Sequence, residues 1–334
     1  MSGKLLLGVD GGDTKTVALV AGPDGLVVGA ARGAGSDIYA YPDPAEAVAV
    51  LRDVVTRALD QAGADVREVG NAVFCLAGAD WPEDVALLQG ALDGFLPDTE
   101  VEVHHDSQGH LWAGHPDGVG IGVAFGTALA MGSRNADGRE WSSTNWVELN
   151  GSLGLGHGAL RAVLDARLGV SPETLLSRTM PPVFGCADVD EMAHLLTNRD
   201  HLGRSHARMS DVGPVVLDAA AAGDAVARSI IDRQLGRLAE YVAAAGRLVD
   251  LPTPWHVSLG GGPTRHASHA ILDGLRAAVD DDTTVTLCVR EPAAGCLLKA
   301  RHSAGLANDQ DVLSRLDATT PDSSFFATLT PRSE

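Results

Sequence analysis

One order of elements occurs twice in this chain: an apolar run, a turn rich in glycine and threonine, a second apolar run and an Asp-Gly turn. The first copy begins at residue 5, and its glycine turn has the sequence DGGDTKT over residues 10–16. The second copy begins at residue 121, with its turn at Gly126-Thr127. Internal similarity is a primary indication of fold. We therefore expect a duplicated α/β domain, for which 334 residues are long enough.

The local pattern predicts the main elements. Closely spaced turns predict a three-stranded antiparallel meander over residues 5–28. A helix is expected from Asp43 to Gly63, because an N-cap aspartate is followed by proline at the first helical position. Further strands are predicted over 72–77, 101–104, 255–259 and 284–289, and residues 155–250 read as mostly helical.

We expect an N-terminal domain over residues 1–117 and a C-terminal domain over 118–305, with a helical insertion at about 170–225. Residues 306–334 are predicted to be a loose tail, since the end of the chain is rich in Thr, Ser, Pro and Asp.

The charge balance narrows the ligands that the chain can bind. A formal net charge of −19 argues against a broad nucleic-acid surface or an anionic membrane, both of which need basic patches. No run of eighteen apolar residues occurs, and the four cysteines lie far apart without a C-x-x-C pair. We therefore expect a cytoplasmic protein with neither a nucleic-acid nor a membrane partner. A polyanionic ligand would be held by local backbone donors and a metal ion.

The first glycine turn has the residue types that a phosphate site needs. Two glycines permit positive φ, so that successive N–H groups can face one concavity. Asp10 can hold Mg²⁺, and Thr14, Lys15 and Thr16 add hydroxyls and a cation. An ordinary hairpin with a surface lysine explains the turn alone equally well. Neither a Walker loop nor a dinucleotide fingerprint is present, since no G-x-x-x-x-G-K-[ST] occurs and a strand follows the turn.

Two further glycine turns follow predicted strands. Gly126-Thr127 could contact the same phosphates as the first turn, and the triple glycine from residue 260 could let the backbone approach a nucleotide base or ribose. Each turn is a weak signal alone. Together, three such turns at strand ends favour a nucleotide site.

With these motifs the chain resembles the sugar kinase, heat-shock ATPase and actin superfamily, over about residues 4–305. Within it, the chain is most similar to the BadF/BadG/BcrA/BcrD ATPase family, which includes N-acetylglucosamine kinases. The motifs that carry the resemblance are VDGGDTKT at 9–16, GAGSD at 33–37, LAGAD at 76–80, the strand ending at Asp106, Gly126-Thr127, SLGGG at 258–262 and PAAGC at 292–296. The resemblance implies two ribonuclease-H-like domains closing over MgATP, with the acceptor held between them.

The resemblance also implies roles for individual residues. It implies an ATP site made of Gly11, Gly12, Asp13, Thr14, Lys15, Thr16, Gly126, Thr127, Gly260, Gly261 and Gly262, with Asp10 as the magnesium ligand. It implies a substrate site made of Ser36, Asp37, Gly78, Asp80 and Asp106. Asp106 would be the base that takes the proton from the attacking sugar hydroxyl. We expect an ATP-dependent kinase of an amino sugar such as N-acetylglucosamine or glucosamine, acting as a homodimer.

The chain departs from the family pattern in three places. Asp37 stands where sugar-binding relatives commonly have Asn, and an ionised carboxylate only accepts hydrogen bonds. It would either pair with a cationic amine of the acceptor or be a turn or cap residue. Asp13 replaces the third glycine of the first turn. Residues 148–156 lack a Gly-Asp pair, for which Glu148 or Ser152 is a possible substitute.

Two other functions remain open at this point. One is an activator ATPase of a 2-hydroxyacyl-CoA dehydratase; relatives of that kind have a cluster-ligating cysteine pair, which this sequence lacks. The other is a degenerate, non-catalytic sugar or nucleotide sensor, suggested by the altered turns. Four histidines near Asp106 match no familiar metal-ligand spacing and are interpreted as solvated or capping residues: His104, His105, His110 and His115.

Overall fold

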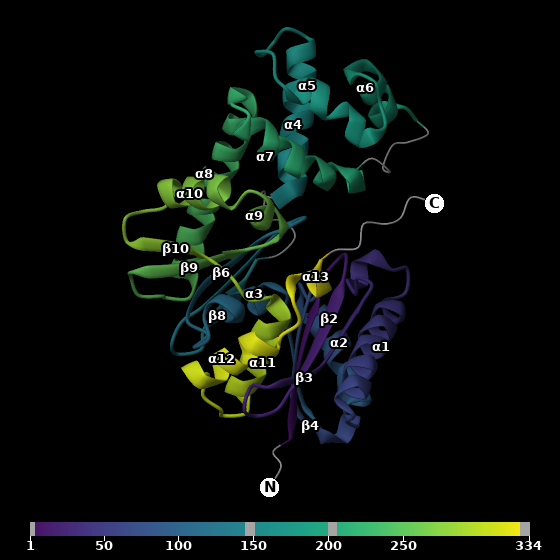
Figure 1. The fold of residues 1–334 in the computed structure, drawn as a ribbon, viewed down its shortest axis with the longest axis vertical. Helices are drawn as coiled ribbons and strands as arrows, with labels where there is room; N and C mark the ends of the chain where they lie inside the picture. Colours follow the sequence, from purple (N-terminus) through teal and green to yellow (C-terminus); the bar gives the residue numbers. More distant parts are fainter. Residues whose placement is uncertain (1–3, 144–150, 200–205, 328–334) are drawn as a thin grey trace. The chain divides into compact units, whose positions relative to one another are not determined.

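The computed structural model describes residues 4–143, 151–199 and 206–327. The chain divides into two compact units, each of which is α/β (Figure 1). The first comprises residues 1–122, 131–145 and 288–334, and the second comprises 123–130 and 146–287. The first unit is therefore discontinuous in sequence. Residues 288–327 belong to it, whereas the sequence predicted a second domain running to residue 305.

The first sheet has five strands in the order β3-β2-β1-β4-β5. The strands are β1 (Leu5–Gly11), β2 (Thr16–Ala21), β3 (Val27–Gly33), β4 (Val69–Leu76) and β5 (Glu100–His105). Strands β1 to β3 pair antiparallel, which confirms the predicted meander. Strands β1, β4 and β5 run parallel, so their carboxyl ends meet at one edge of the sheet.

The second sheet repeats this topology. Its order is β10-β9-β6-β7-β8, with β6 (Gly120–Phe125), β7 (Leu129–Arg134), β8 (Glu140–Ser142), β9 (Trp255–Gly260) and β10 (Thr283–Leu287). Strand β6 corresponds to β1, and the pair β9 and β10, which runs parallel, corresponds to β4 and β5. The same strand order in both sheets confirms the duplication predicted from the repeated turns.

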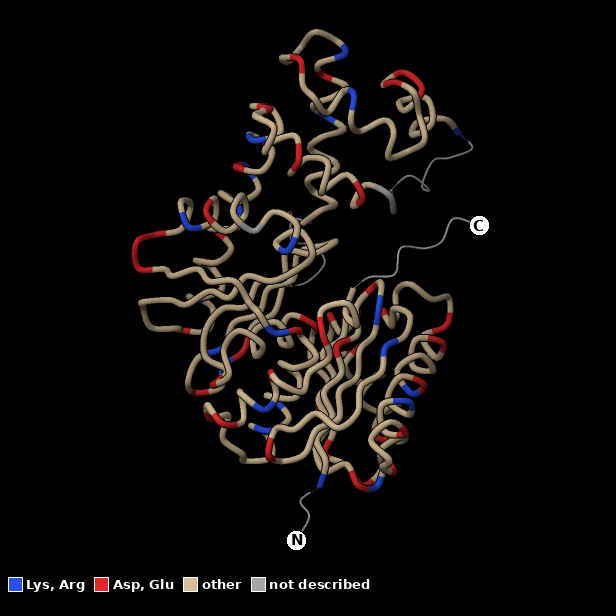
Figure 2. The backbone as a smooth tube through the Cα atoms, viewed as in Figure 1, with Lys and Arg blue, Asp and Glu red and all other residues tan. Residues whose placement is uncertain are grey.

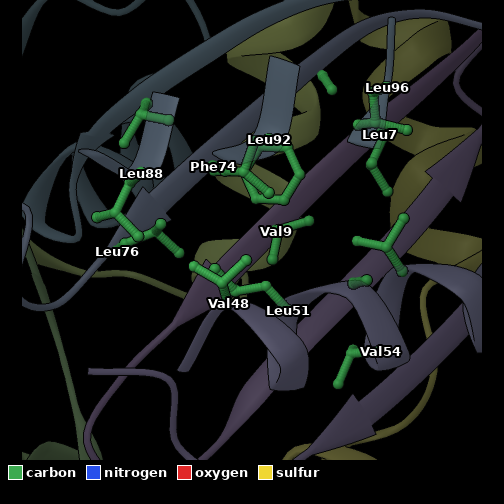
Figure 3. Close-up of a cluster of buried hydrophobic side chains, with 14 of the residues drawn as sticks. Leu7, Val9, Val48, Leu51, Val54, Phe74, Leu76, Leu88, Leu92 and Leu96 are labelled. Carbon is green, nitrogen blue, oxygen red and sulfur yellow. The ribbon is translucent and has the colours of Figure 1, made fainter. Parts of the chain in front are cut away.

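Helices cover both faces of the first sheet. They are α1 (Pro44–Ala62), α2 (Pro82–Phe95), α3 (Ser107–Gly114), α11 (Pro292–Ser303), α12 (Gln310–Thr319) and α13 (Ser323–Phe326). Helix α1 has the predicted caps: Asp43 accepts from the Ala45 N–H, and Gly63 ends the helix at φ 65°. Helices α1 and α2 share one core with the sheet, and α3 and α11 to α13 share another. Figure 3 shows the first core, where Leu7, Val9 and Phe74 of the sheet meet Val48, Leu51, Leu88 and Leu92 of the helices.

Helix α11 packs unusually close to its neighbours because of two glycines. A Cβ on Gly8 of β1 would lie 2.5 Å from the Leu297 nitrogen, and one on Gly295 would lie 2.0 Å from the Gly109 carbonyl oxygen of α3. No larger residue fits at either position without moving backbone. This close packing gives a physical reason for the small residues at the start of the helix.

Two helices form where the sequence predicted a loose tail. Helix α12 begins after Asp309, whose side chain accepts from the Val312 N–H. Leu316 of α12 and Phe326 of α13 are buried in the second core. Arg290 adds a bidentate ion pair with Asp317, at 2.7 and 2.8 Å. A few apolar anchors therefore order this segment despite its polar composition.

The second unit is mostly helical, as predicted for residues 155–250. Its helices are α4 (Gly151–Arg167), α5 (Leu176–Thr179), α6 (Val189–Thr197), α7 (Gly213–Ala221), α8 (Ala225–Leu248), α9 (Gly262–His266) and α10 (Ser268–Ala278). Helix α4 covers Gly151–Arg167, so helical structure is present from four residues before the predicted region. Glu148 lies outside the described residues.

Acidic residues occur in both units (Figure 2), and over the whole sequence they outnumber basic residues. Over the described part of the chain, no helix combines the length and the apolar character that spanning a membrane would require.

Candidate active site

The first glycine turn is tied to two other loops of the first unit. The Ser36 N–H donates to the Gly12 carbonyl at 3.1 Å, and the Thr16 hydroxyl donates to Ser36 Oγ at 2.9 Å. Thr16 and Ser36 are both fully buried. The Ala77 N–H donates to the Gly11 carbonyl at 2.7 Å. Three motifs that are separate in sequence, around residues 10–16, 35–37 and 77–80, therefore form one cluster at the edge of the sheet.

The glycines of this cluster provide space rather than an unusual backbone conformation. Neither Gly11 nor Gly12 has positive φ, so the predicted reason for the two glycines is wrong. A Cβ on Gly11 would lie 2.4 Å from Ser36 Oγ, and one on Gly35 would lie 2.0 Å from the Asp13 carbonyl oxygen. The loops can approach this closely only because side chains are absent.

Lys15 contacts the C-terminal helix of the same unit. Its ammonium donates a hydrogen bond to the Phe326 carbonyl and lies 5.9 Å from the centroid of the Phe326 ring. Lys15 is therefore not simply a surface lysine at the tip of a hairpin. Its position depends on α13, a segment more than three hundred residues away.

Asp13 and Asp37 form a carboxyl pair. Burial, the hydrogen bond with Asp37 and the charges of Asp37, Asp106 and Asp80 raise the pKa of Asp13 to about 7. Asp37 also caps a short helix, since its Oδ1 accepts from the Tyr39 N–H at 2.9 Å. Asp13 therefore does not point away from the other loops. The interpretation of Asp37 as a cap residue is thus confirmed. Its hydrogen bond with Asp13 is a second contact that the sequence did not predict.

Gly78 brings the third loop against this pair. It has φ 78°, a conformation that L side chains rarely adopt, and a Cβ would lie 2.4 Å from Asp37 Oδ1. Both the backbone conformation and the space therefore require glycine at this position.

Asp10 is the last residue but one of the central strand β1, beside the turn. Burial and the charge of Asp106 raise its pKa to about 7, Lys15 opposes this shift, and Glu291 adds to it. Binding of a cation would favour the ionised carboxylate. Mg²⁺ typically takes one or two carboxylates together with phosphate oxygens and water. Asp10 therefore fits as a magnesium ligand. In the described part of the chain, His, Cys, Asp and Glu side chains form no group of three that could hold a metal ion by themselves, so phosphate oxygens and water would complete the site.

Asp106 follows β5 at the start of α3. Its N–H donates to the Leu76 carbonyl at 3.1 Å, which places the residue beside the loop that carries Asp80. Its side chain makes no helix-capping hydrogen bond. The carboxylate instead pairs with His105, whose Nδ1 lies 3.2 Å from Asp106 Oδ1.

The sequence predicted that the histidines near Asp106 are solvated or capping residues. This prediction is wrong for His105. His105 is mostly buried and lies between Asp106 and Asp80, whose Oδ1 is 3.2 Å from His105 Nε2. His104 pairs instead with Glu102 at 2.9 Å. Neighbouring residues of a strand point to opposite faces, so the alternation along β5 could have separated the two histidines. Their partners could not be read from that pattern.

In the second unit, the turn at Gly126-Thr127 is bonded to the start of α4. The Ser152 N–H donates to the Gly126 carbonyl at 2.9 Å, and the Leu153 N–H donates to the Thr127 carbonyl at 3.1 Å. Ser152 is therefore part of the support of this turn. Thr127 itself is exposed.

The triple glycine meets the end of β6. Gly261 has φ 111°, and a Cβ there would lie 2.1 Å from the Phe125 carbonyl oxygen, whereas a Cβ on Gly262 would have open space around it. Gly260 ends β9, and Gly262 begins α9. Two of the predicted ATP-binding motifs, Gly126-Thr127 and residues 260–262, thus both border the end of β6.

Two α/β sheets of one topology, with glycine turns and carboxylates at strand ends, define the class of actin-like ATPases. The family model of the BadF/BadG/BcrA/BcrD ATPases matches residues 7–287. The chain belongs to this family, which confirms the resemblance inferred from its motifs.

Two curated relatives are similar in sequence. The N-acetyl-D-glucosamine kinase of Dictyostelium discoideum is 23% identical over 264 residues, which cover 75% of this chain and 79% of the relative. The N-acetylmuramic acid/N-acetylglucosamine kinase of Clostridium acetobutylicum is 27% identical over 154 residues, which cover 46% of this chain and 50% of the relative.

Solved structures share the fold. A Chromobacterium violaceum protein provisionally named an N-acetylglucosamine kinase has a TM-score of 0.66 at 22% identity, covering 89% of this chain and 99% of that one. A ROK family glucokinase from Streptomyces griseus, solved with glucose and AMPPNP, has a TM-score of 0.56 at 19% identity over 89% of this chain and 98% of that one.

Proposed function

We propose that this protein is an ATP-dependent kinase that transfers the γ-phosphate of ATP to a hydroxyl of a sugar. The observation that carries the proposal is the pairing of two strand-end carboxylates in the first unit. Asp10 is the last residue but one of β1, Asp106 follows β5, and the charge of Asp106 acts on Asp10. A metal-ligand carboxylate and a catalytic base need this proximity, because they act on the same phosphate and hydroxyl.

The proposed chemistry assigns one step to each carboxylate. Asp106 accepts the proton of the sugar hydroxyl while the hydroxyl oxygen forms a bond to the γ-phosphorus. At the same time, the bond between the γ-phosphorus and the bridging oxygen breaks, and that oxygen leaves with ADP. A positioned base of this kind contributes about 10²–10⁴-fold. Asp10 would hold Mg²⁺, which would neutralise charge on the phosphates of bound ATP. Each of the glycine turns at 11–16, 126–127 and 260–262 is assigned to nucleotide binding through its backbone and hydroxyl groups.

An amino sugar is the acceptor that the loops of the first unit favour. Asp37 pairs with Asp13, and the charges of Asp80 and Asp106 also act on Asp13. A cationic amine placed among these carboxyls would relieve their mutual repulsion, because an opposite charge stabilises the ionised form. A free amine such as that of glucosamine supplies this charge, whereas an N-acetyl group does not. Ser36, Gly78 and Asp80 complete the proposed substrate site.

The relatives support a sugar acceptor and leave the choice between these sugars open. Both curated relatives bear the names of N-acetylated amino sugar kinases, and the glucokinase of related fold was solved with glucose. The proposal of a free amine therefore rests on Asp13 and Asp37 of this chain.

The test is ADP release by the purified protein with MgATP and a panel of glucosamine, N-acetylglucosamine and glucose. We expect sugar-dependent release that Asp106→Asn reduces by about 10²–10⁴-fold, since asparagine cannot accept the proton. Asp60→Asn, an exposed aspartate on α1, is the matched control and should keep full activity. Sugar binding without any ADP release would favour the sensor function. Near-normal turnover of Asp106→Asn would overturn the assigned base.

A further inference from the structure

His105 bridges two carboxylates with its two ring nitrogens. Nδ1 lies 3.2 Å from Asp106 Oδ1, and Nε2 lies 3.2 Å from Asp80 Oδ1. The side chains of His105 and Asp80 are only 12% and 3% exposed, so solvent screens these contacts little. The three side chains come from the end of β5, the start of α3 and the loop after β4.

The surroundings of Nδ1 indicate which state the ring takes. The Ser107 hydroxyl lies 2.8 Å from Nδ1, and the Ser107 N–H points at it from 3.3 Å. The backbone contact would suit an Nδ1 lone pair, whereas the carboxylate contact requires a proton. The Ser107 N–H therefore donates to the neutral ring, and protonation of Nδ1 would turn the Asp106 contact into an ion pair.

The charges around the ring favour the protonated state. Burial by itself lowers the pKa of His105, but the charge of Asp106 and the hydrogen bond and charge of Asp80 outweigh it, so the pKa is raised. Two further carboxyls lie within electrostatic reach of this group: Asp13 interacts with Asp80 and Asp106, and Asp10 interacts with Asp106. The imidazolium thus lies among carboxyls that disfavour one another's ionisation.

The contact also determines which part of the Asp106 carboxylate is accessible. Oδ1, the atom that faces His105, is buried, yet the Asp106 side chain as a whole is 23% exposed. The exposed surface therefore lies on the remaining atoms, which include Oδ2. An acceptor hydroxyl can approach that oxygen while Oδ1, which accepts no hydrogen bond from the described residues, lies 3.2 Å from His105 Nδ1.

We propose that His105, anchored by Asp80, is a positioning residue that fixes the Asp106 carboxylate on its Oδ1 side. This inference rests on the proposed kinase function. It assigns a task to Asp80, predicted only as a substrate-binding residue, and to a histidine that the sequence did not connect with catalysis.

The decisive variant is His105→Gln, which removes the charge and keeps a side-chain donor. We expect kcat to fall by up to about 100-fold, as for other misplaced catalytic groups, while the KM for ATP stays unchanged. The acidic limb of the kcat/KM profile should move to higher pH by about 1 unit or more, because the base loses a cation within about 4 Å. A purely structural role would lower the amount of active enzyme without moving this limb.

His104→Gln is the matched control. It changes the preceding residue on the same strand, which pairs with Glu102 and not with Asp106, and it should leave the pH profile where it is. If His105→Gln does not fold by circular dichroism, His105→Asn provides a second neutral replacement with the same expected shift. In the protein without ligands, NMR titration of ¹⁵N-labelled histidine should show a lower His105 pKa in Asp80→Asn than in the wild type.

The outcomes separate the two proposals. An active wild type whose His105→Gln variant keeps the same pH profile and kcat would overturn the role of His105 and leave the kinase function standing. An unchanged His105 titration in Asp80→Asn would overturn the anchoring by Asp80. If no sugar supports ADP release by the wild type, the kinase function fails, and the catalytic role of His105 fails with it.

Discussion

The ammonium of Lys15 donates a hydrogen bond to the backbone carbonyl of Phe326, 311 positions further along the chain. The Arg32 guanidinium donates to the neighbouring Phe325 carbonyl at 2.8 Å. Two cations of the first meander thus hold the last carbonyls of α13, where the negative end of a helix favours positive charge. The C-terminal segment therefore supports the glycine turn proposed to bind phosphate.

Replacing Phe326 with alanine should destabilise the first unit. The side chain is 3% exposed, and a buried phenylalanine replaced by alanine typically costs about 3–5 kcal/mol. We expect a lower free energy of unfolding by about this amount, measured by urea denaturation. Val289→Ala, at a position that is 87% exposed, is the control and should change it by less than about 0.5 kcal/mol. Equal effects of the two variants would contradict the docking of α13.

Gly35→Ala should disrupt the cluster of loops, because its Cβ would lie 2.0 Å from the Asp13 carbonyl oxygen. We expect a lower melting temperature and a loss of sugar-dependent ADP release. Gly90→Ala provides the matched comparison, since a Cβ at that position of α2 meets nothing within 4 Å. Alanine in a helix is favoured over glycine by about 0.5–1 kcal/mol, so Gly90→Ala should be neutral or stabilising. A Gly35→Ala protein as stable and active as Gly90→Ala would argue against the close loop packing.

Asp13 should make the stability of the ligand-free protein depend on pH. Because its folded-state pKa is raised from 3.8 to about 7, its contribution is fully present below about pH 4 and is lost as the pH rises through 7. Asp13→Asn should therefore raise the melting temperature at pH 8 more than at pH 5. Scanning calorimetry of both proteins over this range measures the difference. A constant difference between them would show that Asp13 does not titrate in this range.

Asp37→Asn should change the preferred sugar. Asparagine keeps an acceptor oxygen for the Tyr39 N–H but removes the charge proposed to face an amine. We expect kcat/KM for glucosamine to fall. The ratio of N-acetylglucosamine to glucosamine turnover should rise by about 10-fold, which corresponds to a charged contact worth about 1.5 kcal/mol. The ADP-release assay with both sugars measures this ratio. A wild type that already prefers N-acetylglucosamine strongly would exclude the amine contact.

The sequence alone determined the duplicated α/β fold. Turn residues and apolar periodicity are local signals, and they recur at residues 5 and 121 in the same order. Two sheets of identical strand order follow from them. The motifs around Asp10, Ser36 and Asp80 were also readable, because each follows a predicted strand. Their assembly into one cluster required the parallel pairing of β1, β4 and β5.

The tertiary structure alone decided which residues these motifs contact. The partner of Lys15 lies in a segment whose polar composition predicted a loose tail, and a few buried residues such as Leu316 are enough to order it. The pairing of His105 with Asp80 and Asp106 joins three different elements. Gly35 is needed because of the Asp13 backbone and not because of its own φ. Such contacts depend on how distant segments pack, and no local pattern in the sequence specifies that packing.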